Sequence, residues 1–112
     1  MNKGKIEHLT KITKDIVISL CRESHNPTDD GTGYVNSVKS VLEGMKSYFE
    51  KQGEGLEYQK IYEKIYSFSK RIWIKDITEN RLKESDKSVI EKEALYYDYC
   101  FEHIYKKGDF PL

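Results

Sequence analysis

The sequence predicts an all-α protein that folds as a single-domain four-helix bundle with mostly antiparallel neighbours. Apolar residues recur at alternating spacings of three and four in four separate stretches, which is the pattern of amphipathic helices. The two-residue alternation of a β-strand never persists. The chain of 112 residues is long enough for one apolar core and too short for two ordinary domains, so residues 1–112 are expected to form one domain.

The first two helices are predicted over residues 5–24 and 34–52, on either side of a segment that concentrates turn-forming residue types. One side of the first helix carries the apolar residues Ile6, Leu9, Ile16, Val17 and Leu20. The second helix has the most regular apolar stripe in the chain, made of Tyr34, Val35, Val38, Val41, Leu42, Met45, Tyr48 and Phe49. Both stripes predict helices that contribute to one shared core.

A third helix is predicted over residues 56–76, antiparallel to the second because only a short glycine-containing turn joins them. Its core stripe consists of Tyr58, Ile61, Ile65, Phe68 and Ile72, flanked by Tyr62, Tyr66 and Trp73. Ile74 falls outside this stripe, and we expect residues 77–82 to fold back over it; the alternatives are that a partner chain or a second copy covers it. Periodicity leaves open whether residues 77–84 form a short extra helix or continue the third one.

A fourth helix is predicted over residues 86–107. Ser88 to Glu91 has the S-x-x-E form of a capping box, although the helix could equally start at Ser85-Asp86, and a basic pair followed by glycine ends it. Its inward stripe consists of Ile90, Ala94, Tyr97, Phe101 and Ile104. The tail, residues 108–112, either lies over the bundle through Phe110 and Leu112 or hangs free.

Composition limits the class of protein. Charged residues make up 34% of the chain and hydrophobic residues 38%, so the core must draw on the nine tyrosines and four phenylalanines. The 19 basic and 19 acidic residues cancel, which gives no global support for nucleic-acid binding. No apolar run approaches the roughly 18 residues of a membrane span, and the N-terminal segment is too charged for a signal peptide. We therefore expect a cytoplasmic protein without membrane contact.

No catalytic, metal or cofactor site is predicted. A metal site in a helical bundle needs inward-facing Glu-x-x-His motifs, whereas His8 and His103 each directly follow a glutamate and diverge from it around the helix. His103 lies three residues after Cys100, but a free cysteine beside a core stripe usually acts as a small hydrophobe. The protein is therefore expected not to be an enzyme.

Two charged faces remain as candidates for binding. On the fourth helix, Glu91, Asp98 and Glu102 share a face with Leu95 and Tyr99, which suits capture of a basic protein surface. Asp29 and Asp30 in the first loop add to this acidic set. Alternatively, Leu95 and Tyr99 only widen the buried arc of their helix.

The second face is a basic ridge on the third helix, made of Lys60, Lys64, Arg71 and Lys75. It suits phosphate contacts, but no aromatic or amide side chain is interleaved with it for reading bases, so a solvated outer face is the competing interpretation.

From these faces we expect a small inhibitor that binds another protein, of the immunity-protein or antitoxin type. It would neutralise a toxin or a nucleic-acid-acting enzyme by occluding it with the acidic, Tyr-containing helical face. The alternative expectation is a nucleic-acid-associated regulator, or a small helical subunit of a larger complex, that uses the basic ridge.

Overall fold

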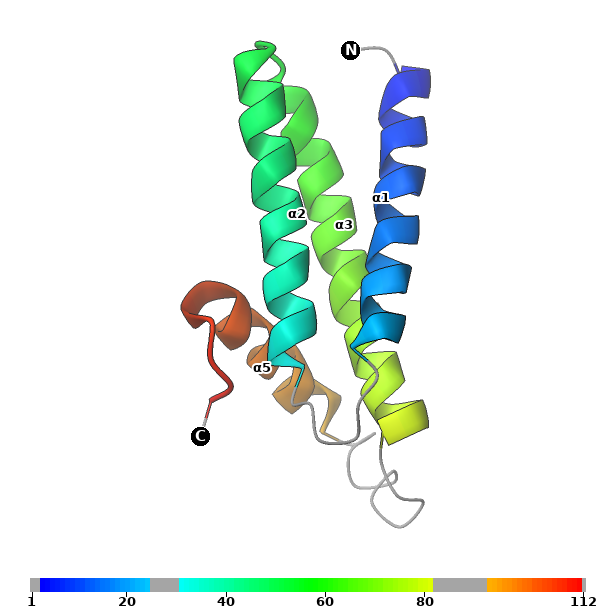
Figure 1. Ribbon diagram of the computed structural model, residues 1–112, viewed down its shortest axis with the longest axis vertical. Helices are drawn as coiled ribbons and strands as arrows, with labels where there is room; N and C mark the ends of the chain where they lie inside the picture. Colours follow the sequence, from blue (N-terminus) through cyan, green and yellow to red (C-terminus); the bar gives the residue numbers. More distant parts are fainter. Residues whose placement is uncertain (1–2, 25–30, 82–92, 112) are drawn as a thin grey trace.

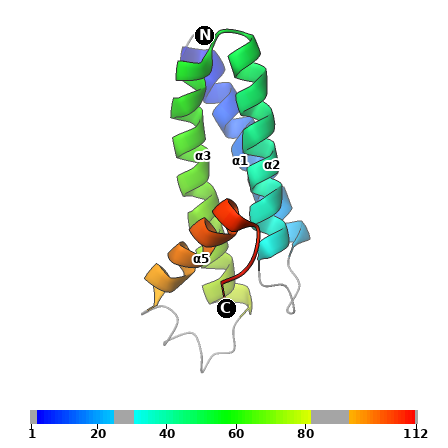
Figure 2. The ribbon, with the colours of Figure 1, turned by 90° about the vertical axis from the view of Figure 1, so that its left-hand side faces the viewer.

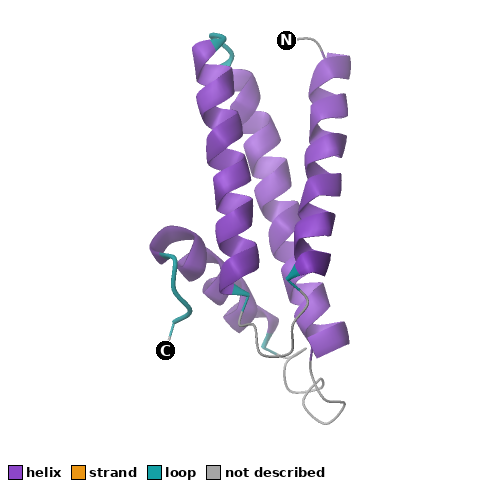
Figure 3. Cartoon of the chain, viewed as in Figure 1, coloured by secondary structure: helices purple, strands orange, loops and turns teal. Residues whose placement is uncertain are grey.

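The computed structural model describes residues 3–24, 31–81 and 93–111, and every regular element within these ranges is helical (Figures 1 and 3). The elements are α1 (Lys3–Glu23), α2 (Thr32–Lys51), α3 (Gly55–Asp76), the π-helix η1 (Ile77–Arg81) and α5 (Ala94–Lys107). The four α-helices pack against one another, which confirms the prediction of an all-helical single domain.

Three long helices form the body of the molecule and the fourth lies across them. Consecutive helices among α1, α2 and α3 run in opposite directions, so α1 and α3 are parallel, and they lie in contact (Figure 1). The shorter α5 crosses α2 and α3 obliquely (Figure 2). It packs over the beginning of α2 and the second half of α3, and this placement decides which of its side chains reach solvent.

The buried side of α1 overlaps the predicted side, since Val17 is buried and Ile6, Leu9 and Leu20 pack against the core, but the helix is rotated from the predicted orientation. Ile16 was expected in the core but is 41% exposed, whereas Thr10, Thr13, Val17 and Cys21 are buried. The rotation follows from the close packing of α1 against α3. Threonine can occupy this side because its hydroxyl is satisfied locally: Thr10 donates to the Ile6 carbonyl and Thr13 to the Leu9 carbonyl, each at 2.7 Å.

Most of the α2 stripe is buried as predicted, but Val41 is only half-buried and Tyr48 is exposed. Tyr34, Val35, Val38, Leu42 and Phe49 are buried and Met45 packs against them, but Tyr48 is 56% exposed. Tyr48 contacts only the edge of the core, where its ring meets that of Phe49 with 5.4 Å between centroids. The Tyr34 hydroxyl donates to the Ser69 carbonyl at 2.9 Å, and the Tyr58 hydroxyl donates to the Leu42 carbonyl, so both pair within the core.

The end of α3 differs from the expectation in two respects. Trp73, predicted at the flank, is fully buried in the core, and Ile77 is buried beside it. Residues 77–81 continue α3 as one π-helical turn and do not fold back over Ile74, which is itself packed against the core. The Thr78 hydroxyl donates to the Ile74 carbonyl at 3.0 Å and supports this continuation. Residues 82–84 lie outside the described ranges.

The fourth helix begins later than predicted. α5 starts at Ala94, after Glu93 in a non-helical conformation (φ −112°, ψ 28°), so residues 86–107 are not one uninterrupted helix. Residues 86–92, including Ile90 of the predicted stripe, lie outside the described ranges. Ala94 is exposed because it is the first residue of the helix, whereas Phe101 and Ile104 are buried as expected. The C-terminal tail packs against the core through Phe110, and Leu112 lies outside the described residues.

Gly31 allows α2 to begin directly against the indole of Trp73. Its φ of +92° is in the left-handed region, and a Cβ added there would lie 2.2 Å from Nε1 of Trp73. We expect Gly31→Ala to lower the free energy of unfolding by about 3 kcal/mol, measured by urea denaturation, since it combines backbone strain with overpacking.

Gly44 provides the matched control, because a Cβ added there meets nothing within 4 Å. Gly44→Ala should raise the stability by up to about 1 kcal/mol through helix propensity. Equal effects of the two substitutions would contradict the close approach of Gly31 to Trp73.

Candidate protein interface

The inner side of α5 is held against α3 by aromatic packing. The ring of Trp73 lies 6.0 Å from that of Tyr97 and 5.8 Å from that of Phe101, measured between centroids. Cys100, Phe101 and Ile104 are fully buried. Because these residues all lie on one side of α5, the opposite side is left facing away from the bundle.

A lysine on α3 fixes α5 from a second side. The Nζ atom of Lys70 lies 2.9 Å from Oδ1 of Asp98 and 2.9 Å from Oε1 of Glu102. Its side chain is only 16% exposed, and it also lies over the ring of Tyr66 at 5.2 Å. Burial lowers the pKa of Lys70, but the two carboxylates outweigh this effect and the pKa is raised above its ordinary value. Two residues of the predicted acidic face therefore have a structural partner.

The outer face of α5, defined here as Leu95, Tyr96 and Tyr99, is apolar and exposed. Leu95 is 86% exposed and Tyr99 is 54% exposed, and Tyr96 is also exposed. Tyr99 packs at 5.9 Å against the ring of His103 one turn later. This exposure contradicts the alternative that Leu95 and Tyr99 only widen a buried arc, because no helix or tail residue that the structure describes covers either of them.

The structure brings together only part of the predicted binding set. Leu95, Asp98, Tyr99 and Glu102 all lie on α5, with the two acids along one side of its outer face. Glu91, Asp29 and Asp30 lie outside the described residues. Sequence reasoning missed Tyr96, although it directly precedes the inward-facing Tyr97 and so had to point elsewhere. It also missed Lys70. The available signal was that Lys70 is a lysine of the third helix that does not lie on the basic ridge.

The predicted basic ridge lies on another side of the molecule. Lys60, Lys64, Arg71 and Lys75 are all exposed on one face of α3, and Lys64 and Lys75 line grooves shared with α1. This face is the one turned away from α5 (Figure 1). The two candidate faces are therefore separate surfaces.

The thiol of Cys100 does not have the environment of an activated nucleophile. It is fully buried, and burial raises its pKa, although the hydrogen bond with Tyr96 acts in the opposite direction. His103 is directed toward Tyr99 on the outer side of the helix. In the part of the chain that the structure describes, no group of three or more His, Cys, Asp or Glu residues is arranged to hold a metal ion.

None of the described helices combines the length and the apolar character needed to cross a membrane. Comparisons with family models, with curated proteins and with solved structures give no match to this chain.

We predict that Lys70→Met weakens the attachment of α5. The substitution leaves two half-exposed carboxylates without their cation, and we expect a loss of about 1 kcal/mol in the free energy of unfolding. The substitution should increase the rate of amide hydrogen exchange more in α5 than in α1. Lys64→Met on the same helix is the control, because Lys64 is exposed and has no ion pair among the described residues. A change in α5 exchange with both variants would contradict the proposed role of Lys70.

The contribution of Lys70 should also depend on pH. Because its pKa is raised in the folded protein, it stabilises the fold fully below the ordinary value of 10.5 and loses this effect as the pH rises through the folded value. The stability difference between the natural protein and Lys70→Met, measured by denaturant titration, should therefore be constant near neutral pH and shrink above pH 10.5. A difference that persisted unchanged at alkaline pH would argue against an ionic contact.

Proposed function

We propose that this protein binds another protein through the outer face of α5 and inhibits it by occlusion, in the manner of an immunity protein or antitoxin. The observation that carries the proposal is the exposure of Leu95 and Tyr99 side by side on an otherwise well-packed helix. An apolar group and an aromatic group one turn apart resemble the anchors that dominate the energy of protein interfaces.

The fixed attachment of α5 to α3 supports its role in binding a partner protein. Trp73 packs against its inner side and Lys70 binds its acidic side, so the helix is positioned before any partner arrives. A surface that is already ordered loses little conformational entropy on binding. Tyr99 contributes a large contact area with few rotatable bonds, which reduces that cost further.

The charge around the outer face favours a basic partner. Asp98 and Glu102 carry two negative charges against the single positive charge of Lys70, and the exposed Glu93 adds another negative charge at the start of α5. Such a rim steers association with a positively charged surface. Enzymes that act on nucleic acids have surfaces of this kind, and a helix laid across their substrate groove would exclude the substrate.

The decisive variant is the double substitution Leu95→Ser/Tyr99→Ser. It removes both anchors without changing charge, and it leaves Asp98, Glu102 and Lys70 intact. We expect a protein captured by the natural chain to bind this variant at least about tenfold more weakly, measured by calorimetry with the purified partner. The partner's catalytic activity should be inhibited by the natural chain and restored with the variant.

A closely matched control exists on another face. Leu56 is 86% exposed and Tyr48 is 56% exposed, so Leu56→Ser/Tyr48→Ser removes the same residue types at nearly the same exposure. The control should bind and inhibit like the natural chain. Equal loss in both double variants, or no loss in either, would overturn the assignment to α5, and a captured protein whose activity is unaffected would overturn inhibition.

A further inference from the structure

The groove between α1 and α3 gathers positive charge from both helices. Lys11 and Lys14 of α1 and Lys64 of α3 line one groove of about 520 Å³, together with Thr10 and a single acid, Glu7. The two helices are parallel and in contact, so this convergence arises only when α1 packs on the edge of α3 that carries the basic ridge. We call Lys11, Lys14 and Lys64 the basic groove.

The three lysines of the basic groove have no ion pair with any described residue. The Nζ atom of Lys14 lies 5.1 Å from the centre of the Phe68 ring, which holds this cation at the groove. Three like charges that converge beside a single acid repel one another, and an anion bound among them would relieve that repulsion. The groove is thus a local concentration of positive charge in a chain whose net charge is zero.

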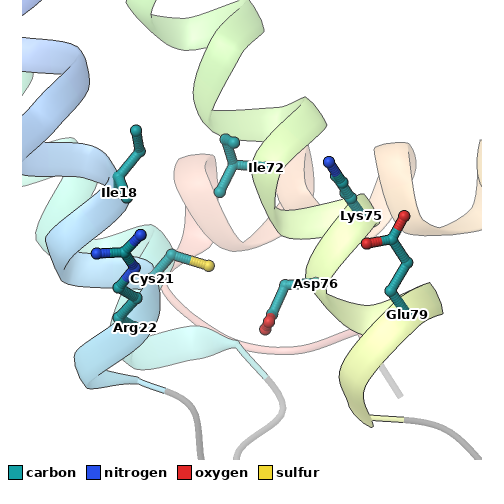
Figure 4. Close-up of a pocket in the computed structure, with 7 residues that line it drawn as sticks. All are labelled: Ile18, Cys21, Arg22, Ile72, Lys75, Asp76 and Glu79. Atoms are coloured by element: carbon teal, nitrogen blue, oxygen red, sulfur yellow. The ribbon is translucent and has the colours of Figure 1, made fainter.

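The rest of the basic ridge extends this surface along α3. Lys60 and Arg71 are exposed on either side of Lys64, and from Lys60 to Lys75 the helix rises about 22 Å. Around Lys60 the surface also carries Glu57 and Glu63. At the far end, Arg22 and Lys75 line a second groove of about 230 Å³ (Figure 4). Figure 4 shows Asp76 and Glu79 in the same groove, so acids offset the bases there, whereas the positive charge is strongest around Lys64.

We infer that the basic groove binds the phosphate backbone of double-stranded nucleic acid. Lys11, Lys14 and Lys64, with the exposed Lys60 and Arg71 beside them, present several cations spaced along two helices. Such a set matches an extended polyanion better than a small ligand, because a duplex carries one charge for each ~1.7 Å of its axis. Phe68 is the aromatic residue at the groove and is half-buried beneath Lys14, so it offers no free face for stacking on unpaired bases. Binding is therefore independent of sequence and made through phosphates.

A duplex also fits this surface better than an anionic membrane does. The residues that line the basic groove are all polar or charged, and the neighbouring Phe68 is half-buried beneath Lys14. A helix that lies on a membrane needs exposed apolar side chains to insert, in addition to its basic residues. The basic groove also lies on the side of α3 opposite to α5, so a nucleic acid and a protein partner can be bound at the same time (Figures 1 and 2).

Fluorescence anisotropy with a labelled duplex of about 20 base pairs tests the inference on the full chain. We expect binding at low ionic strength and a plot of log affinity against log salt with a slope of about −3, corresponding to three phosphate contacts. Lys11→Gln/Lys64→Gln should weaken binding at least about tenfold and make this slope shallower by about 2. Circular dichroism and thermal melting verify that the variant folds.

The matched control is Lys46→Gln/Lys51→Gln, which removes the same charge from exposed positions on α2. It should leave the affinity within about twofold. Absence of binding at low ionic strength, or equal weakening by both pairs, would overturn the proposed groove. Tighter, Lys11- and Lys64-dependent binding to phosphatidylserine vesicles would overturn it in favour of a membrane. Leu95→Ser/Tyr99→Ser should keep full duplex affinity, so the two proposals fail independently.

Discussion

The burial of the Trp73 indole is the constraint on which the rest of the structure depends. This ring meets Gly31 at the start of α2 and the rings of Tyr97 and Phe101 on α5, so one side chain of α3 joins three helices. Its Nε1–H group has no hydrogen-bond acceptor among the described residues, which costs about 1–3 kcal/mol. The large apolar area of the ring offsets that cost, and only a glycine at position 31 lets the backbone approach it.

The placement of α5 follows from this packing and from one ion-pair cluster. Aromatic contacts hold its inner side, while Lys70 bridges Asp98 and Glu102 a short distance away. An ion pair at this degree of exposure adds little energy, but it requires two carboxylates on consecutive turns to meet one ammonium group. The bridge therefore selects the orientation in which Leu95 and Tyr99 face outward.

The same arrangement separates two surfaces of different chemistry. α5 covers one edge of α3 and presents apolar and acidic groups, whereas α1 covers the other edge and adds Lys11 and Lys14 to the ridge lysines. Lys70 and its two acidic partners therefore lie on one side of α3, and the lysines of the basic groove lie on the other. The proposed protein interface and the proposed phosphate-binding groove therefore do not overlap.

The helices themselves could be read from the sequence, because apolar periodicity and turn-forming residues are local properties of the chain. The bounds of α2 and most of its buried stripe follow from such patterns, and so does the inward side of α5 through Phe101 and Ile104. Local patterns could not place Ile16 in solvent or Trp73 in the core. These outcomes depend on which neighbour each helix meets, and several rotations of a wide apolar arc satisfy the same periodicity.

The candidate sites also combine features that follow from the sequence with features that depend on tertiary contacts. The sequence by itself determined that Leu95 and Tyr99 share a helix face with Asp98 and Glu102, and that Lys60, Lys64, Arg71 and Lys75 form a ridge, because both sets are spacings along one helix. Only the tertiary structure decided that Leu95 and Tyr99 remain exposed, that Lys70 binds the two acids, and that Lys11 and Lys14 join Lys64. Each of these results from contact between helices distant in sequence, and a single helix carries no information about where its partners lie.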